Sequence, residues 1–124
     1  MTGLRGGVLI VEDEYLIAEG IRLQLEDMGL DVCGVAGTAE SAVAMAEKHR
    51  PSVVLMDVRL RGGGDGVEAA MAIHEKVGSK VIFVTGSREP ATLTRINEDH
   101  PVAILFKPLF GRQLQAAVEQ ALAL

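Results

Sequence analysis

The sequence predicts an α/β domain built on a doubly wound, five-stranded parallel sheet with five helices. Four uninterrupted apolar runs rich in β-branched residues occur at residues 8–11, 53–56, 81–84 and 102–106. Such runs are typical of strands that are buried on both faces of a sheet. Helical patterns separate them, and strict alternation of strand and helix favours parallel strands joined by right-handed crossovers. The length of 124 residues suits one domain, which we expect to span residues 1–124.

A fifth, weaker strand is expected after the first helical pattern, at residues 31–35. It contains Gly34, and glycine lowers the preference of a segment for the strand conformation. We therefore expect this strand at an edge of the sheet. In the strand order 2-1-3-4-5, strands 1 and 3 flank the point where the order reverses, which is where open α/β sheets bind their ligands.

Five helices are expected after the strands in turn, and they occupy residues 14–28, 39–49, 66–77, 90–99 and 111–124. In the first helix Ile17, Ile21 and Leu25 recur at helical spacing and form an apolar stripe. Thr38 and Asp65 immediately precede the second and third helices and are predicted N-caps. The fourth begins with a proline, which the first helical turn favours, and the last repeats apolar residues on one face.

Composition excludes several classes of protein. The 12 basic and 17 acidic residues give a net charge of −5, and without a basic run the chain lacks the surface that binds nucleic acid. A single cysteine, Cys33, excludes a disulfide scaffold. The apolar runs are far shorter than the ~20 residues of a membrane span. The first residues lack the features of a signal peptide, so we expect a cytoplasmic protein.

Polar side chains follow the strands at the points where the strands end. Glu12 and Asp13 follow the first strand, Asp57 the third, Thr85 the fourth and Lys107 the fifth. Because the carboxyl ends of parallel strands meet at one edge of a sheet, we expect these five residues to share one rim. The sequence therefore predicts a polar site there.

The chemistry of these side chains favours metal-assisted phosphoryl transfer. Three carboxylates on one rim repel one another unless a cation lies among them. Oxygen ligands in small number favour Mg²⁺, which retains several waters and shares phosphate oxygens. The hydroxyl of Thr85 and the ammonium of Lys107 are suited to phosphoryl oxygens. A carboxylate nucleophile beside such groups matches a reaction that depends on positioning and charge compensation.

Four short motifs stand in register with the strand–helix units, and they are Val11-Glu12-Asp13-Glu14, Met56-Asp57-Val58-Arg59, Val84-Thr85-Gly86 and Phe106-Lys107-Pro108. Each motif alone is weak, but all four in this order are highly specific. Through them the sequence resembles the response-regulator receiver domain of two-component signalling over essentially the whole chain. The resemblance implies a flavodoxin-like fold. Because 124 residues are just enough for the receiver, we expect the chain to carry no output module of its own.

The resemblance also implies a role for each residue at the metal. Asp57 would be the phosphoacceptor and would ligate Mg²⁺ together with Asp13 and the backbone carbonyl of Arg59. Glu12 would act on the ion through a water molecule. The phosphoryl group would come from a sensor histidine kinase or a histidine phosphotransfer protein, as in a phosphorelay.

The same resemblance assigns the other half of the site to Thr85 and Lys107, each bonding a phosphoryl oxygen. The Lys107–Pro108 bond is similar to a cis peptide of the family. Ile104 stands three residues before Lys107, where many receivers have a tyrosine or phenylalanine that changes rotamer on activation. The aromatic partner of the threonine is therefore missing here, and we expect the output to depend on backbone movement or another surface.

We interpret the chain as a stand-alone receiver that switches conformation on phosphorylation and regulates an unidentified protein partner. It would be no enzyme beyond its own phosphorylation and dephosphorylation. Residues 83–86 resemble the FAT GUY subgroup of single-domain receivers, although Ser87 and Arg88 do not complete that motif.

Two alternatives remain open. One is a Mg²⁺-dependent phosphatase with an aspartate nucleophile, although Arg59 stands where such enzymes need a second aspartate. The other is a pseudo-receiver that binds protein partners constitutively.

Overall fold

The computed structural model describes residues 6–60, 64–86, 89–98, 101–109 and 111–123. The strands are β1 (Val8–Val11), β2 (Val32–Ala36), β3 (Val53–Asp57), β4 (Lys80–Thr85) and β5 (Ala103–Phe106). The helices are α1 (Tyr15–Asp27), α2 (Ala39–His49), α3 (Gly66–Lys76), α4 (Pro90–Glu98) and α5 (Gly111–Leu122). Every element that the sequence predicts is present, in the predicted order.

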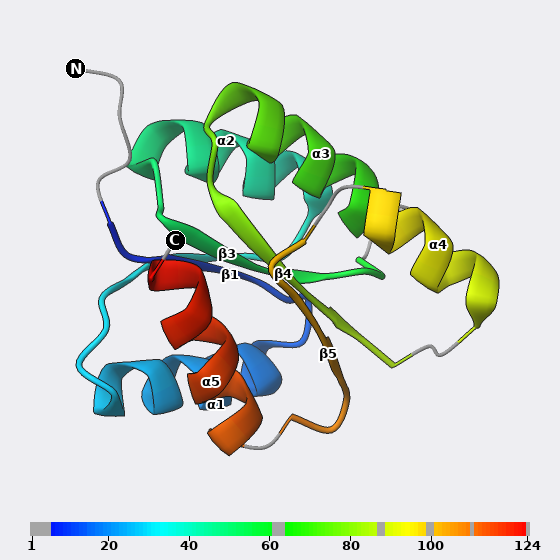
Figure 1. The fold of residues 1–124 in the computed structure, drawn as a ribbon. Helices are drawn as coiled ribbons and strands as arrows, with labels where there is room; N and C mark the ends of the chain where they lie inside the picture. Colours follow the sequence, from blue (N-terminus) through cyan, green and yellow to red (C-terminus); the bar gives the residue numbers. More distant parts are fainter. Residues whose placement is uncertain (1–5, 61–63, 87–88, 99–100, 110, 124) are drawn as a thin grey trace.

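The five strands form one parallel sheet in the order β2-β1-β3-β4-β5, which confirms the predicted topology. The weak strand β2 lies at one edge, as its sequence predicts, and β5 lies at the other. Helices cover both faces of the sheet, with α2, α3 and α4 on one side and α1 and α5 on the opposite side (Figure 1). The side chains of β1 and β3 are buried throughout, because both strands are central and covered on both faces.

Two apolar clusters hold these layers together, one on each face of the sheet. Leu9, Met56 and Phe83 belong to the cluster beneath α2, α3 and α4. Ile10 and Leu55 belong to the cluster beneath α1 and α5. Successive residues of a strand point to opposite faces, so each central strand contributes to both clusters. This explains why the strand sequences are continuously apolar and do not alternate.

The predicted caps fix where two helices begin. The hydroxyl of Thr38 accepts a hydrogen bond from the backbone N–H of Ser41 at 3.0 Å, and the hydroxyl of Ser41 accepts one in return from the N–H of Thr38. The carboxylate of Asp65 accepts a hydrogen bond from the N–H of Val67 at 2.8 Å. Each bond satisfies a backbone donor that the helix itself leaves without a partner.

The buried face of α1 differs from the predicted stripe. Ile21 and Leu25 are buried as expected, but the third buried residue is Ala18, and Ile17 is 38% exposed. The helix is therefore rotated toward the smaller side chain, because Ala18 lets α1 approach the sheet closely. As a result the start of α1 presents apolar side chains to the surface, and Leu16 is 83% exposed.

Helix α4 is the shortest of the five, and Ile96 is its only fully buried residue. Leu93 is half-buried against the same apolar cluster. Two of its polar side chains, Thr94 and Asn97, donate hydrogen bonds to backbone carbonyls four residues earlier in the helix. Helix α4 thus depends on few tertiary contacts. Within the described part of the chain, no helix is long and apolar enough to cross a membrane.

Candidate functional site

The carboxyl ends of the central strands surround an open cavity of about 640 Å³. The residues that line it are Asp13, Glu14, Asp57, Arg59, Thr85, Gly86, Glu89 and Lys107. Four of the five polar residues that the sequence predicts for one rim line this cavity. The fifth, Glu12, does not line it, but its carboxylate contacts Lys107. The predicted order of the strands is what brings these residues together, since they come from four separate segments of the chain.

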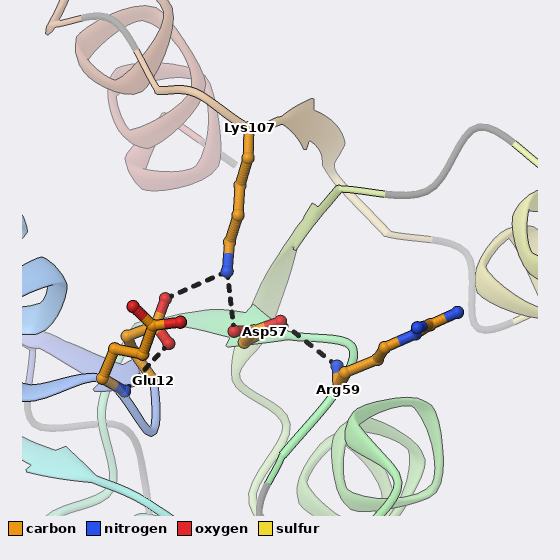
Figure 2. Close-up of polar contacts among 5 residues, drawn as sticks. Glu12, Asp57, Arg59 and Lys107 are labelled. Carbon is orange, nitrogen blue, oxygen red and sulfur yellow. Dashed lines mark hydrogen bonds and ion pairs between the residues drawn. The ribbon is translucent and has the colours of Figure 1, made fainter.

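The ammonium of Lys107 connects two buried carboxylates (Figure 2). Its Nζ lies 3.0 Å from Oδ2 of Asp57 and 3.2 Å from Oε1 of Glu12. Asp57 and Glu12 are only 6% and 4% exposed, so both carboxylates lie in a poorly solvated environment. Charge-assisted hydrogen bonds are strong in such surroundings. Lys107 therefore compensates part of the negative charge at the ends of β1 and β3.

The surroundings of Glu12 favour its protonated form. Burial is the main cause and raises the pKa of Glu12 to about 7, with the N–H of Glu14 opposing the rise and the charge of Asp57 adding to it. The N–H of Glu14 donates to Oε2 of Glu12 at 3.2 Å. Burial alone would lower the pKa of Lys107, but its hydrogen bond to Asp57 and the charges of both carboxylates raise it. One ammonium thus faces more negative charge than it can neutralise.

Glu12, Asp13 and Asp57 form a cluster that could hold a metal ion. Each offers a carboxylate oxygen, and these atoms all lie within 4.8 Å of one another. Hard divalent cations such as Mg²⁺ and Ca²⁺ take oxygen ligands of this kind. A divalent cation among these oxygens would favour the ionised form of the buried Glu12 carboxyl, whose pKa burial and the charge of Asp57 raise. The donor set therefore fits a hard divalent cation.

The segment after β3 holds Asp57 in place. The backbone N–H of Arg59 donates to Oδ1 of Asp57 at 3.1 Å, while the guanidinium of Arg59 points away from the cluster (Figure 2). Gly66, the first residue of α3, approaches the same strand end, and a Cβ atom there would lie 2.0 Å from the backbone oxygen of Asp57. Glycine is thus required where α3 begins.

Residues 8–119 match the sequence pattern of the response regulator receiver domain. The chain belongs to that family. The match covers most of the chain, and receiver domains as a class act as phosphoacceptors. The fold agrees with the family, since the sheet order and the five helices are those of CheY-like receivers.

Two curated relatives of this receiver domain are regulatory proteins. It is 34% identical over 116 residues to the transcriptional regulatory protein PdtaR of Mycobacterium tuberculosis, covering 94% of this chain and 56% of PdtaR. It is 34% identical to the phyllosphere-induced regulator PhyR of Methylorubrum extorquens, covering 93% of this chain and 43% of PhyR. The receiver thus spans about half the length of these curated relatives.

A solved structure resembles the receiver closely along its whole length. The signal receiver domain of a modulated diguanylate cyclase from Desulfovibrio desulfuricans G20 superposes with a TM-score of 0.88 and is 39% identical. The superposition covers 97% of this chain and 94% of that one.

The structure also shows what sequence reasoning missed in this receiver. Glu14 and Glu89 line the cavity, and neither was among the predicted site residues. Position alone could have indicated them, because Glu14 extends the first acidic motif and Glu89 precedes α4.

The Lys107–Pro108 bond is cis, as predicted. Ser87 and Arg88, on which the subgroup assignment depends, lie outside the described residues, so that assignment stays a prediction.

Proposed function

We propose that Asp57 accepts a phosphoryl group from a histidine kinase or a histidine phosphotransfer protein, and that the phosphorylated chain regulates a protein partner in the cytoplasm. The observation that carries the proposal is the position of Lys107 between Asp57 and Glu12 at the mouth of a cavity that Thr85 also lines. A nucleophilic carboxylate is here placed beside a cation, a hydroxyl and further carboxylates, and all face one open space.

In the proposed reaction a carboxylate oxygen of Asp57 attacks the phosphorus of a phosphohistidine. The P–N bond breaks, its electron pair stays on the imidazole nitrogen, and an acyl phosphate forms on Asp57. Lys107 would then transfer its hydrogen bond from Asp57 Oδ2 to a phosphoryl oxygen, and the hydroxyl of Thr85 would donate to another. Such preorganised donors lower the barrier because phosphoryl transfer depends mainly on charge compensation.

Mg²⁺ would be held by Asp13, Asp57 and the backbone carbonyl of Arg59, with Glu12 acting through a water molecule. When bound, the ion would supply positive charge to the oxygens of the phosphoryl group. The crowding of three carboxylate oxygens within 4.8 Å supports this role, because Lys107 alone leaves the cluster negative. The backbone N–H of Arg59 meanwhile keeps one oxygen of Asp57 oriented at 3.1 Å.

We further propose that the phosphodonor protein docks on the start of α1. An apolar groove of about 470 Å³ runs beside that helix, and Leu16, Ile17 and Leu109 line it. Lys107 and Glu12 line the same groove, so a partner seated there would lie next to the phosphoacceptor cluster. Exposed apolar surface that adjoins a polar site is typical of protein interaction surfaces.

A direct test is to incubate the protein with a small phosphodonor such as acetyl phosphate and Mg²⁺, and to measure the intact mass. We expect the mass to increase by one phosphoryl group in the wild type and in Asp27→Asn, which changes an exposed aspartate of α1. Asp57→Asn and a sample without Mg²⁺ should remain unmodified. A wild type that gains no phosphoryl group would contradict the proposal and favour a constitutive binding module. Sustained turnover of an aryl phosphate would favour a phosphatase.

A further inference from the structure

One ion pair connects α4 to the segment that follows the phosphoacceptor strand. The guanidinium of Arg95, in the second turn of α4, contacts Oδ2 of Asp65 through its Nη2 atom. Thirty residues separate the two in the sequence, and they come from different elements. In Figure 1 the second half of α4 lies beside the start of α3, which is where Asp65 stands.

Asp65 has a second bond that fixes its position. Its other carboxylate oxygen, Oδ1, accepts the hydrogen bond from the N–H of Val67 that begins α3. Burial alone would raise the pKa of Asp65, but the hydrogen bond from Arg95, the N–H of Val67 and the charge of Arg95 lower it. Both oxygens of this carboxylate are thus engaged, one by the helix that follows it and one by α4.

The backbone of Asp65 continues the connection to the phosphoacceptor. Asp65 pairs with Arg59 in an antiparallel bridge, so the two ends of the segment between β3 and α3 lie side by side. The N–H of Arg59 in turn donates to Oδ1 of Asp57. An unbroken series of contacts therefore runs from Arg95 through Asp65 and Arg59 to Asp57.

From this series of contacts we infer that Arg95 and Asp65 are positioning residues for the metal and phosphoryl site. By holding Asp65, Arg95 keeps the paired backbone of Arg59 and Asp65 in the conformation that presents Arg59 to Asp57. This inference rests on the proposed function, in which the backbone carbonyl of Arg59 ligates Mg²⁺.

The same coupling must act in the reverse direction. Whatever stabilises the position of Arg59 also stabilises the Arg95–Asp65 ion pair, because the coupling free energy between two sites is reciprocal. Helix α4 buries only Ile96 completely, so one added contact is a substantial part of its tertiary stabilisation. Occupation of the site by Mg²⁺ is therefore expected to protect α4 from local opening.

The test compares Mg²⁺ binding to the full chain by calorimetry in the wild type, Arg95→Gln, Asp65→Asn and the double variant. Asparagine caps a helix about as well as aspartate, so Asp65→Asn removes the charge and keeps the start of α3. Partly exposed ion pairs are weak, and we expect each single variant to raise the Mg²⁺ dissociation constant about two- to fivefold. The double variant should bind no more weakly than either single variant, because both remove the same contact.

Hydrogen exchange of α4 amides with and without Mg²⁺ gives a readout that a merely structural role would not change. Mg²⁺ should slow exchange in the wild type and in Lys76→Gln, a control that breaks a similar ion pair between Lys76 and Glu47, on α3 and α2. It should not slow exchange in Arg95→Gln, and Arg95→Lys should restore the effect.

The two proposals fail in different ways. If the wild type binds no Mg²⁺, the proposed function fails, and the coupling fails with it. If the wild type binds Mg²⁺ and Arg95→Gln binds it equally well, only the coupling is refuted. Additive losses in the double variant, or Mg²⁺-dependent protection of α4 that persists in Arg95→Gln, would also refute it.

Discussion

Substitution of Glu12 by glutamine should change how the stability of the protein depends on pH. Glu12 is 4% exposed and its carboxylate faces Asp57 as well as Lys107. Glutamine has nearly the shape of the protonated glutamate and never ionises. At a pH where Glu12 is protonated, the variant and the wild type should therefore be nearly equal in stability.

The magnitude follows from the shift of the pKa from 4.5 to about 7 on folding. Between these values the folded protein binds more protons at Glu12 than the unfolded chain does, so stability falls as pH rises. One pKa unit corresponds to about 1.36 kcal/mol, and the whole shift amounts to about 3 kcal/mol. This contribution is fully present below the unfolded pKa and is lost once the pH has risen through the folded pKa.

The assay is urea unfolding followed by circular dichroism, without Mg²⁺, at about pH 5 and about pH 8. Between these conditions the free energy of unfolding of the wild type should fall by about 2.5 kcal/mol relative to that of Glu12→Gln, because pH 5 already lies above the unfolded pKa of 4.5. Glu47→Gln, which changes an exposed glutamate, should follow the wild type. Identical pH dependence in the wild type and in Glu12→Gln would refute the placement of Glu12 as a buried, crowded carboxyl.

Four further predictions follow from individual contacts. Gly66→Ala should lower the free energy of unfolding by about 1–3 kcal/mol because its Cβ would meet the backbone of Asp57, whereas Gly20→Ala in α1, with open space around it, should raise it. Lys107→Gln should slow phosphorylation by acetyl phosphate at least about tenfold, and an unchanged rate would exclude its role in charge compensation. Leu16→Asp should slow transfer from a phosphohistidine protein without affecting acetyl phosphate, whereas Leu23→Asp, outside the groove, should affect neither. Hydrogen exchange should be fastest in α4 among the five helices, and uniform protection would contradict this.

The fold could be predicted because its strongest signals are local. The continuous apolar run of Val53–Met56 is short and rich in β-branched residues, which is typical of a strand covered on both faces, and such strands favour parallel pairing with helices between them. The site followed from the same signals, since Asp57 and Lys107 each come directly after a strand. Once the strands are parallel, residues fifty positions apart in the sequence meet at one edge of the sheet. Nζ of Lys107 accordingly lies 3.0 Å from Oδ2 of Asp57.

What could not be predicted depends on the exact rotation and mutual placement of the helices. The helical period of α1 permits either Ile17 or Ala18 to face the sheet, and only packing decides that Ala18 is buried and Leu16 exposed. Likewise, nothing in the sequence of α4 indicates that Arg95 contacts Asp65, because Asp65 comes before β4 in the chain and α4 comes after it. The contact exists because the second half of α4 lies beside the start of α3, and that geometry is tertiary. If the Arg95–Asp65 pair positions the site, two kinds of information are needed to describe it. The residues that do the chemistry can be recognised in the sequence because they follow the strands directly. The ion pair that positions them depends on where α4 lies in the folded protein, and the local sequence does not show this.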